Sequence, residues 1–461
     1  MPMESDPQKG SDWLKRYALP TKNPYFPEFQ RLYRFFRASQ YWPRNEIREF
    51  QFGLLKKQYA LARQHVPLYR RLYADFPAEL DSWDTFHKLP ILTRADMNAA
   101  GDERKCEQLP YGIKPIGSAF TSGSTGHVLE VVATTASDMV RAAIGAREME
   151  WLDLDPSCDA FFCRAIIKPN QPNAESLRKG VMIPEWSPGP VEKLYRCGKG
   201  YYIDVSTSTR QIALFLHHTA PGFLLGNPSA LAEAARMLPA DSRARKSVKK
   251  IRCIGETLTQ DDLETFQSVF DAELQDHYSS AEVNVIATTA PDGDGYLVHD
   301  ENVYLEVVRQ DGTPREIGEE GRIVVTNLQP YATPFLRYDI ADLGAIGEPR
   351  GEYGLTRLNK LVGRRMELIR TESGESIHLS TIFLLLHRVE GIRGVVIRQK
   401  SFFEFELVVT QLPDSPPGIE ARVAEVFRKA IPFLVEVNVV LTDDLPRASS
   451  GKLQKFQWVG D

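Results

Sequence analysis

The segment with the most distinctive chemistry is Phe120-Thr121-Ser122-Gly123-Ser124-Thr125-Gly126-His127, a run of hydroxyl and glycine residues. Glycines let a backbone wrap closely around an anion, and amides and hydroxyls can donate hydrogen bonds to phosphate oxygens. The run is not a Walker loop, and it is not a serine-hydrolase nucleophile turn, because Ser122 stands where that turn has glycine. The segment is therefore a candidate phosphate-binding loop, although a surface turn has the same composition.

A second candidate segment, Tyr278-Ser279-Ser280-Ala281-Glu282, lies at the end of a predicted buried strand at 274–278. An aromatic ring there can stack on a purine and a carboxylate can hold a metal ion, whereas a glutamate in that position could equally cap a helix. Gly255-Glu256 follows the preceding predicted strand, 248–254. Parallel strands joined by right-handed crossovers bind ligands at their carboxyl ends. Both segments are therefore predicted at the active-site edge of one sheet.

Three further segments combine charged residues with glycine or apolar neighbours. The first of them follows a predicted meander and reads Leu336-Arg337-Tyr338-Asp339-Ile340-Ala341-Asp342. It could form either a ribose clamp or a surface ion pair. Gly363-Arg364 comes next in the chain. The last segment, Pro446-Arg447-Ala448-Ser449-Ser450-Gly451-Lys452, presents one lysine on a loop that contains glycine. A single lysine is usually a solvated charge, so the order of the five segments carries more information than any one of them.

Alternating strands and helices separate these segments, which predicts an α/β fold. Residues 29–73 are predicted to form amphipathic helices that bury their aromatic rings and leave arginine in water, in preference to a nucleic-acid or membrane surface. An antiparallel meander is predicted at 296–328 around the turn Asp311-Gly312. Apolar runs predict strands, with helices between them, at 129–133, 223–225, 248–254 and 274–278.

A smaller unit is predicted to begin after Gly363-Arg364, with its hinge between Leu361 and Glu367. Its expected elements are a hairpin around Ser373-Gly374, helices near 380–390 and 419–430, and strands near 395, 405–410 and 435–441. The predicted architecture is therefore a large N-terminal α/β domain, residues 1–362, with parallel sheets and an antiparallel meander. A small α/β C-terminal domain, residues 363–461, completes it.

The composition excludes several other classes of protein. The chain has 461 residues, a formal net charge of -5 and 25% charged residues, which argues against a strongly basic nucleic-acid binder. No apolar stretch reaches the roughly 18 residues needed to cross a membrane, and residues 1–6 lack a signal-peptide pattern. The five cysteines form no C-x-x-C pair, so neither a disulfide scaffold nor structural zinc is expected. A cytoplasmic location is expected; the oligomeric state is left open.

Taken in order, the five segments resemble the adenylate-forming superfamily of acyl-CoA synthetases, adenylation domains and luciferases, over residues 110–455. Two earlier phrases, Val66-Pro67-Leu68-Tyr69-Arg70-Arg71-Leu72 and Leu89-Pro90-Ile91-Leu92-Thr93-Arg94, resemble the phenylacetate-CoA ligase branch. The resemblance implies an ATP-dependent, AMP-forming ligase whose site lies between a large domain and a small mobile domain. In such enzymes a carboxylate attacks the α-phosphate of ATP, which gives an acyl-adenylate and pyrophosphate.

The resemblance also implies roles for individual residues. Thr121–Gly126 would hold the β- and γ-phosphates, Gly255-Glu256 would lie along the adenine, and Tyr278 would stack on it. Asp342 would grip the ribose hydroxyls with the help of Arg364. Lys452 would be catalytic, bridging the acid and the α-phosphate, and Glu282 would be both catalytic and the magnesium ligand. The implied nucleotide-binding residues are Thr121, Ser122, Gly123, Ser124, Thr125, Gly126, Gly255, Glu256, Tyr278, Ser279, Asp342 and Arg364.

Several positions depart from the superfamily pattern. His127 replaces the usual lysine, Ser279 a glycine, Ala281 a hydroxyl residue and Met366 an aspartate. The segment that is rich in glycine in CoA ligases, where it lines the pantetheine channel, is polar and acidic here at residues 370–376. These departures leave adenylation plausible and leave the acceptor open.

The function implied by the resemblance is activation of an aromatic or aryl-acrylic carboxylic acid by ATP and magnesium, followed by transfer to CoA. An aromatic acid is favoured by Phe161, Phe162 and Phe223, which could line a pocket or belong to the core. Within the same chemistry, the acceptor could instead be an amine, a carrier-protein thiol or a small nucleophile such as nitrite.

Two hypotheses from other classes remain. A catalytically degraded protein that only binds nucleotide is suggested by His127 and Ala281, whereas the intact Glu282, Asp342 and Lys452 count against it. A P-loop kinase is opposed by the absence of a Walker sequence. Neither nucleic acid nor membrane is expected as a partner.

Overall fold

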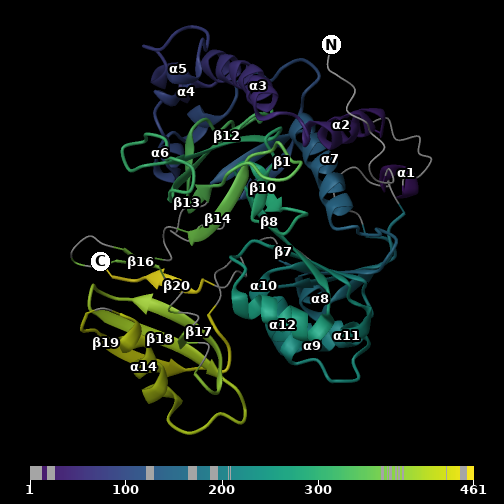
Figure 1. Ribbon diagram of the computed structural model, residues 1–461, viewed down its shortest axis with the longest axis vertical. Helices are drawn as coiled ribbons and strands as arrows, with labels where there is room; N and C mark the ends of the chain where they lie inside the picture. The colour runs from purple at the N-terminus through teal and green to yellow at the C-terminus, as the bar shows by residue number, and fades with distance from the viewer. Residues whose placement is uncertain are drawn as a thin grey trace. The chain divides into compact units, whose positions relative to one another are not determined.

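The computed structural model describes residues 13–17, 26–120, 129–164, 174–186, 196–205, 207, 209–364, 368–370, 372, 376–378, 382, 385–386, 389–431, 433–446 and 454–460. The described chain divides into two compact units. The first unit holds residues 1–159, 184–200 and 275–362, and the second holds 160–183, 201–274 and 363–461. Figure 1 follows the elements along the chain from purple to yellow.

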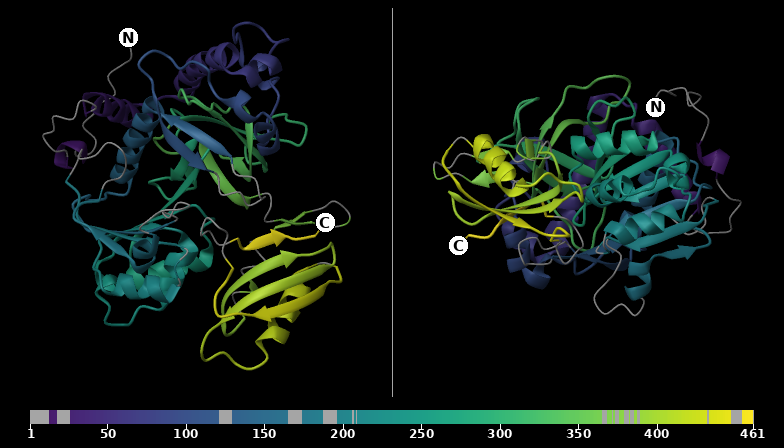
Figure 2. Two further views of the ribbon diagram at one scale, coloured as in Figure 1. Left: turned by 180° about the vertical axis from the view of Figure 1, so that it is seen from behind. Right: turned by 90° about the horizontal axis from the view of Figure 1, so that it is seen from below.

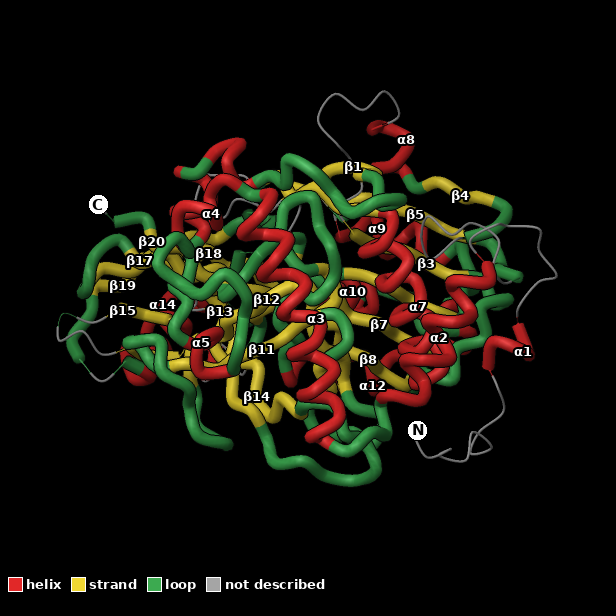
Figure 3. The backbone as a smooth tube through the Cα atoms, turned by 90° about the horizontal axis from the view of Figure 1, so that it is seen from above, coloured by secondary structure: helices red, strands yellow, loops and turns green. Residues whose placement is uncertain are grey.

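The first unit begins with amphipathic helices, as the sequence predicts for residues 29–73. In the helix at 26–39, Phe29, Tyr33 and Phe36 are buried, whereas Arg31 and Arg34 are exposed. This helix packs against a later one at 135–151 (Figure 3). The helices are α1 (Trp13–Tyr17), α2 (Phe26–Ser39), α3 (Arg44–His65), α4 (Pro67–Leu72), α5 (Trp83–His87), α6 (Arg94–Ala99), the short 3-10 turn η1 (Gly101–Arg104) and α7 (Thr135–Trp151).

The strands of the first unit form a mostly antiparallel array in the order β11-β12-β13-β14-β10-β9-β8. The predicted meander is confirmed, since β11 pairs antiparallel with β12 across the turn at Gly312, whose φ is 85°. A separate hairpin joins β1 and β2. The bounds are β1 (Pro115–Phe120), β2 (Glu130–Thr134), β8 (Glu273–Ser280), β9 (Asn284–Thr289), β10 (Tyr296–Val298), β11 (Val303–Val308), β12 (Gly321–Asn327), β13 (Tyr338–Ile346) and β14 (Arg357–Arg364).

The second unit contains strands in the order β7-β6-β3-β5-β4, of which β3, β6 and β7 are parallel. Of these, β6 and β7 are the strands predicted at 223–225 and 248–254. Gly226 in β6 has no room for a side chain, because an added Cβ would lie 2.2 Å from the carbonyl oxygen of Cys163. A capping box formed by Thr259 and Asp262 begins α12. Asn227 is the N-cap of α10, and its side chain makes no capping hydrogen bond. The elements are β3 (Ala160–Arg164), α8 (Ala174–Lys179), β4 (Val181–Ile183), β5 (Gly200–Asp204), α9 (Thr209–His217), β6 (Phe223–Gly226), α10 (Pro228–Arg236), α11 (Arg243–Ser247), β7 (Lys250–Ile254) and α12 (Gln260–Phe270).

The C-terminal part of the second unit is a small sheet in the order β19-β18-β17-β20, with α14 lying across one face (Figure 2). Its core brings Phe405 of β18 against Phe427 of α14, whose ring centroids are 5.1 Å apart. A functional division at residues 362 and 363 remains a prediction. The elements are the predicted hairpin of β15 (Leu368–Arg370) and β16 (Ser376–His378), then β17 (Ile392–Gln399), β18 (Glu404–Gln411), α14 (Ile419–Ala430), β19 (Glu436–Leu441) and β20 (Phe456–Trp458).

Two further observations concern the described residues. All five cysteines lie among the described residues and are free thiols. Within the described helices, none is both long enough and apolar enough to cross a lipid bilayer.

Candidate functional site

Two of the predicted nucleotide-binding residues are in direct contact in the first unit. Tyr278, near the end of β8, donates its hydroxyl to Oδ2 of Asp342, within β13, at 2.7 Å. Asp342 is buried and Tyr278 is half-buried. A ring that can stack on a purine therefore lies beside a carboxylate that can accept hydrogen bonds from a ribose. The sequence predicts both residues, and the structure shows that they meet.

Backbone irregularity at the end of β8 marks the same place. The pairing of β8 with β9 shifts register between Tyr278 and Ser279. Such bulges redirect the side chains that follow them and are frequent beside functional sites. The predicted residue Ser279 therefore lies at the point where the strand changes direction, one residue after the aromatic ring.

Glu282 lies in the turn between β8 and β9, and its side chain is only 3% exposed. Its Oε1 accepts hydrogen bonds from Nη2 of Arg94, at 3.0 Å, and from the hydroxyl of Tyr338, at 3.1 Å. Burial raises the pKa of Tyr338 and the negative charge of Glu282 raises it further, so this hydroxyl stays protonated and donates. The helix-cap interpretation of Glu282 is wrong, because a strand follows it.

The environment of Glu282 fits one ligand of a nucleotide-bound magnesium ion. Among the residues that the structure describes, no three His, Cys, Asp or Glu side chains gather into a group that could hold a metal by themselves. Magnesium in nucleotide sites typically takes one or two carboxylates, and phosphates and water complete its coordination. Both hydrogen bonds to the Glu282 carboxylate fall on Oε1, so Oε2 is the oxygen that could face a cation.

Arg337, in the same motif as Asp342, is structural. Its guanidinium is buried, pairs with both carboxylate oxygens of Glu306 at 2.9 and 3.2 Å, and donates to the carbonyls of His87 and Leu89. It is therefore neither a ribose clamp nor a surface ion pair. The backbone at Leu92 bridges β13, donating to the carbonyl of Arg337 at 2.9 Å. Arg337 thus fixes the loop that leads to Arg94.

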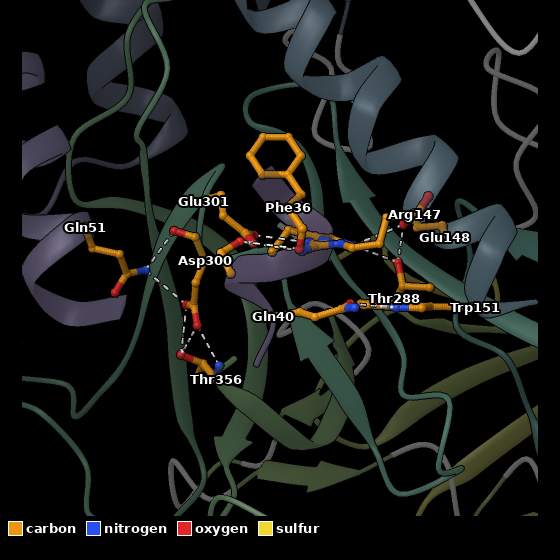
Figure 4. Close-up of polar contacts among 12 residues, drawn as sticks. Phe36, Gln40, Gln51, Arg147, Glu148, Trp151, Thr288, Asp300, Glu301 and Thr356 are labelled. Atoms are coloured by element: carbon orange, nitrogen blue, oxygen red, sulfur yellow. Dashed lines mark hydrogen bonds and ion pairs between the residues drawn. The ribbon is translucent and has the colours of Figure 1, made fainter. Parts of the chain in front are cut away.

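A buried polar network that the sequence did not predict lies behind β8 (Figure 4). Arg147 on α7 is fully buried and donates to the two carboxylate oxygens of Glu301 at 2.7 and 3.1 Å. It also donates to the carbonyl of Phe36 at 2.8 Å, and Ser39 donates to Glu301 at 2.6 Å. Burial alone would raise the pKa of Glu301, but the adjacent guanidinium of Arg147 lowers it below its usual value. The signal available in the sequence was two charged residues, 147 and 148, in the apolar stripe of α7.

The network reaches the strand that carries Tyr278. Nη2 of Arg147 lies 2.7 Å from Nδ1 of His299 and can only donate, so the ring proton of His299 is on Nε2. That nitrogen lies 3.1 Å from Oε1 of Glu148. The same Oε1 lies 3.0 Å from Nδ1 of His277, the residue before Tyr278. Buried hydrogen bonds therefore fix β8 from behind.

The lowered pKa values of two histidines lead us to expect that the free energy of unfolding depends on pH. Burial lowers the pKa of His299, and burial together with the nearby charge of Arg337 lowers the pKa of His87 from 6.5 to about 4. As the pH falls below 6.5, the unfolded chain gains protons that the folded chain refuses, so the free energy of unfolding should decrease. The decrease should continue as the pH approaches the lower pKa values that His87 and His299 have in the folded chain.

Urea unfolding between pH 7.5 and 5 measures this slope. His87→Gln and His299→Gln should each make it shallower, and the exposed His218 provides a control through His218→Gln. An equal change of slope in all three variants would contradict the assignment to His87 and His299.

In the second unit, Gly255 and Glu256 follow β7 as predicted. Gly255 has a φ of 77°, a left-handed conformation that favours glycine. Ser229, in the first turn of α10, donates to the Glu256 carboxylate at 2.5 Å. This contact holds the segment that the resemblance assigns to adenine, and Ser229 is a residue that the sequence analysis did not single out.

The aromatic residues considered for the acid pocket belong to the core of the second unit. Phe161, Phe162 and Phe223 are at most 5% exposed. Phe162 stacks on Tyr202 with ring centroids 4.5 Å apart. These side chains therefore fill the protein interior.

Other predicted site residues lie outside the described part of the structure. They include the candidate phosphate loop Thr121–Gly126, Lys452, for which the resemblance implies a catalytic role, and the departures His127 and Met366. The backbone of Arg364 ends β14, and its side chain is not described.

The fold is that of adenylate-forming acyl ligases. Solved structures of 2-hydroxyisobutyryl-CoA ligase match in three states, among them a postadenylation state and a thioesterification state. The postadenylation state has a TM-score of 0.71 and 18% identity over 92% of this chain and 91% of that one. The thioesterification complex with 2-HIB-AMP and CoA has a TM-score of 0.58 and 19% identity over 92% of each chain. The anthranilate CoA ligase AuaEII in complex with anthranoyl-AMP has a TM-score of 0.54 and 12% identity over 73% of this chain and 64% of that one. No protein-family profile and no curated protein sequence matches the chain.

Proposed function

We propose that this protein activates a carboxylic acid with ATP and magnesium as an acyl-adenylate. The observation that carries the proposal is the contact between Tyr278 and Asp342, with Glu282 four residues after the tyrosine, in the fold of acyl-CoA ligases. The ring that would stack on the base then lies on β8, the carboxylate that would bind the ribose lies on β13, and the carboxylate that would bind the metal lies in the turn after β8. Adenylation needs positioning and charge compensation more than covalent help from the protein.

Each residue would contribute a separate part of the site. Tyr278 and Asp342 would orient the nucleoside, with Arg364 assisting at the ribose and Gly255-Glu256 beside the base. Thr121–Gly126 would bind the β- and γ-phosphates, and Lys452 would bring the acid to the α-phosphate. Magnesium held by Glu282 would supply positive charge to the phosphates.

The substrate we propose is an aromatic or aryl-acrylic acid. Its support is the structural similarity to an anthranilate CoA ligase, since Phe161, Phe162 and Phe223 are core residues. CoA is the first candidate acceptor, because both structural neighbours are named as CoA ligases. The exposed acidic Glu372 between β15 and β16 favours the alternative, a smaller acceptor such as an amine or nitrite, since CoA phosphates are themselves negative.

A pyrophosphate-release screen tests this function. We expect release that requires ATP, magnesium and one class of aryl acid, with small branched acids such as 2-hydroxyisobutyrate as the comparison. Adding CoA, a carrier protein, amines or nitrite in turn should identify the acceptor by its acceleration of turnover. Nucleotide binding without pyrophosphate release for any acid would instead support the degraded nucleotide-binding protein.

A further inference from the structure

Arg94 is held beside Glu282 by a loop that the fold fixes at several points. The residue is the first of α6, and Thr93 before it forms a capping box with Asp96. Leu92 forms a parallel β-bridge with Tyr338 of β13, and its carbonyl accepts a hydrogen bond from the amide of Asp339 at 2.8 Å. The guanidinium of Arg94 is 23% exposed, whereas the carboxylate it pairs with is 3% exposed. The ion pair therefore joins a rigid loop to the β8–β9 turn.

The geometry divides the Glu282 carboxylate into two functionally different oxygens. Arg94 and Tyr338 come from separate parts of the chain, and both contact Oε1. A carboxylate whose first oxygen accepts two hydrogen bonds cannot rotate freely about its last bond. Its second oxygen then has a fixed direction, which is what a ligand to a metal ion requires.

We propose that Arg94 is a positioning residue of the metal–nucleotide site: together with the Tyr338 hydroxyl it holds Oε1 of Glu282, which directs Oε2 to the cation. This inference rests on the proposed function, because it assumes that a nucleotide-bound cation reaches Glu282. A competing role is possible in the same geometry, since a guanidinium could occupy the carboxylate in place of the metal. The two roles predict opposite effects on metal affinity when Arg94 is removed.

Direct measurement of metal binding separates these roles without depending on turnover. The full-length protein is saturated with α,β-methylene ATP, and bound Mn²⁺ is measured from the loss of the free-ion EPR signal. Arg94→Met should weaken Mn²⁺ binding by about 10–100-fold, the usual effect of losing a group that orients a metal ligand. Arg94→Lys should recover part of the loss, because it keeps the charge but not the forked geometry. Metal-free binding of the analogue in EDTA should change less than about twofold, since the base and ribose contacts remain.

The chain supplies a matched control in Arg44. This arginine is 32% exposed and pairs at 2.7 Å with Asp300, whose side chain is 1% exposed, so the ion pair resembles that of Arg94 in burial. Arg44→Met should therefore cost similar folding stability and leave Mn²⁺ affinity unchanged. Tyr338→Phe keeps the Arg94 ion pair and removes the hydrogen bonds that the hydroxyl makes with Glu282 and Arg94, and it should weaken Mn²⁺ binding by a smaller factor.

Each outcome decides between the possibilities. Equal Mn²⁺ affinities for Arg94→Met and Arg44→Met would overturn the positioning role, and tighter binding by Arg94→Met would show competition instead. If Arg94→Met does not fold, unchanged affinity in both Arg94→Lys and Tyr338→Phe would overturn the inference, and weakened affinity in both would support it. If the unsubstituted protein binds no metal–nucleotide complex, the proposed function itself fails; normal binding that Arg94 does not affect removes this inference alone.

Discussion

Replacement of Lys452 by alanine is expected to slow acyl-adenylate formation by about 10²–10⁴-fold, a typical penalty for removing a preorganised charge from a transition state. An ammonium has three donors and a compact charge, which suits a bridge between the acid's carboxylate and the α-phosphate. ATP affinity should change little, because residues of the large predicted domain would hold the nucleotide. Consumption of a chemically supplied acyl-adenylate should also survive if the small domain withdraws the lysine for that step.

Two measurements on Lys452→Ala test the separation of the half-reactions. The variant is first given acid and ATP, and pyrophosphate release is followed; it is then given the synthetic adenylate with its acceptor. The control is Lys429→Ala, which removes an exposed lysine paired with Glu425 within α14 and should leave both rates unchanged. Equal losses in both half-reactions of Lys452→Ala would show that this lysine is structural or shared.

Substitution of Arg147 by methionine is expected to lower the free energy of unfolding by about 3–5 kcal/mol, the usual cost of leaving a buried carboxylate without its partner. The carboxylate at risk is that of Glu301, whose side chain is 3% exposed and whose partner is fully buried. His299 would lose its hydrogen bond to the guanidinium at the same time. The expected effect on the folding equilibrium constant is therefore more than about a hundredfold.

Urea denaturation measures this loss, and two further variants interpret it. Arg70→Met breaks an ion pair with Glu107 in which both side chains are about half exposed, so it should cost no more than about 1 kcal/mol. The double variant Arg147→Met with Glu301→Gln removes the unpaired charge and should recover part of the stability. A loss in Arg147→Met as small as that in Arg70→Met would contradict the burial of this pair.

Local sequence determined the types of several elements and was enough to name several candidate site residues. Periodicity predicts α14 at 419–430 because apolar residues recur on one helical face, and the structure has the same bounds. The Thr259 capping box is equally local, since its partner lies three residues away. Tyr278, Glu282 and Asp342 could be named from the order and chemistry of their segments. Such features depend on neighbours along the chain, which a single sequence displays directly.

Only the tertiary structure decided which groups meet. Arg94 and Glu282 are 188 residues apart, and Tyr278 and Asp342 are 64 apart, so no local pattern pairs them. The segment of Arg337 could have been a ribose clamp or a surface ion pair by its sequence, yet burial against Glu306 makes this arginine a structural residue. Phe161 and Phe162 are residue types that could line an aromatic-acid pocket, but they lie in β3 and are buried in the core. A side chain's chemistry is set by its residue type, whereas its solvation and its partners depend on long-range packing, and that packing determines what the side chain can do.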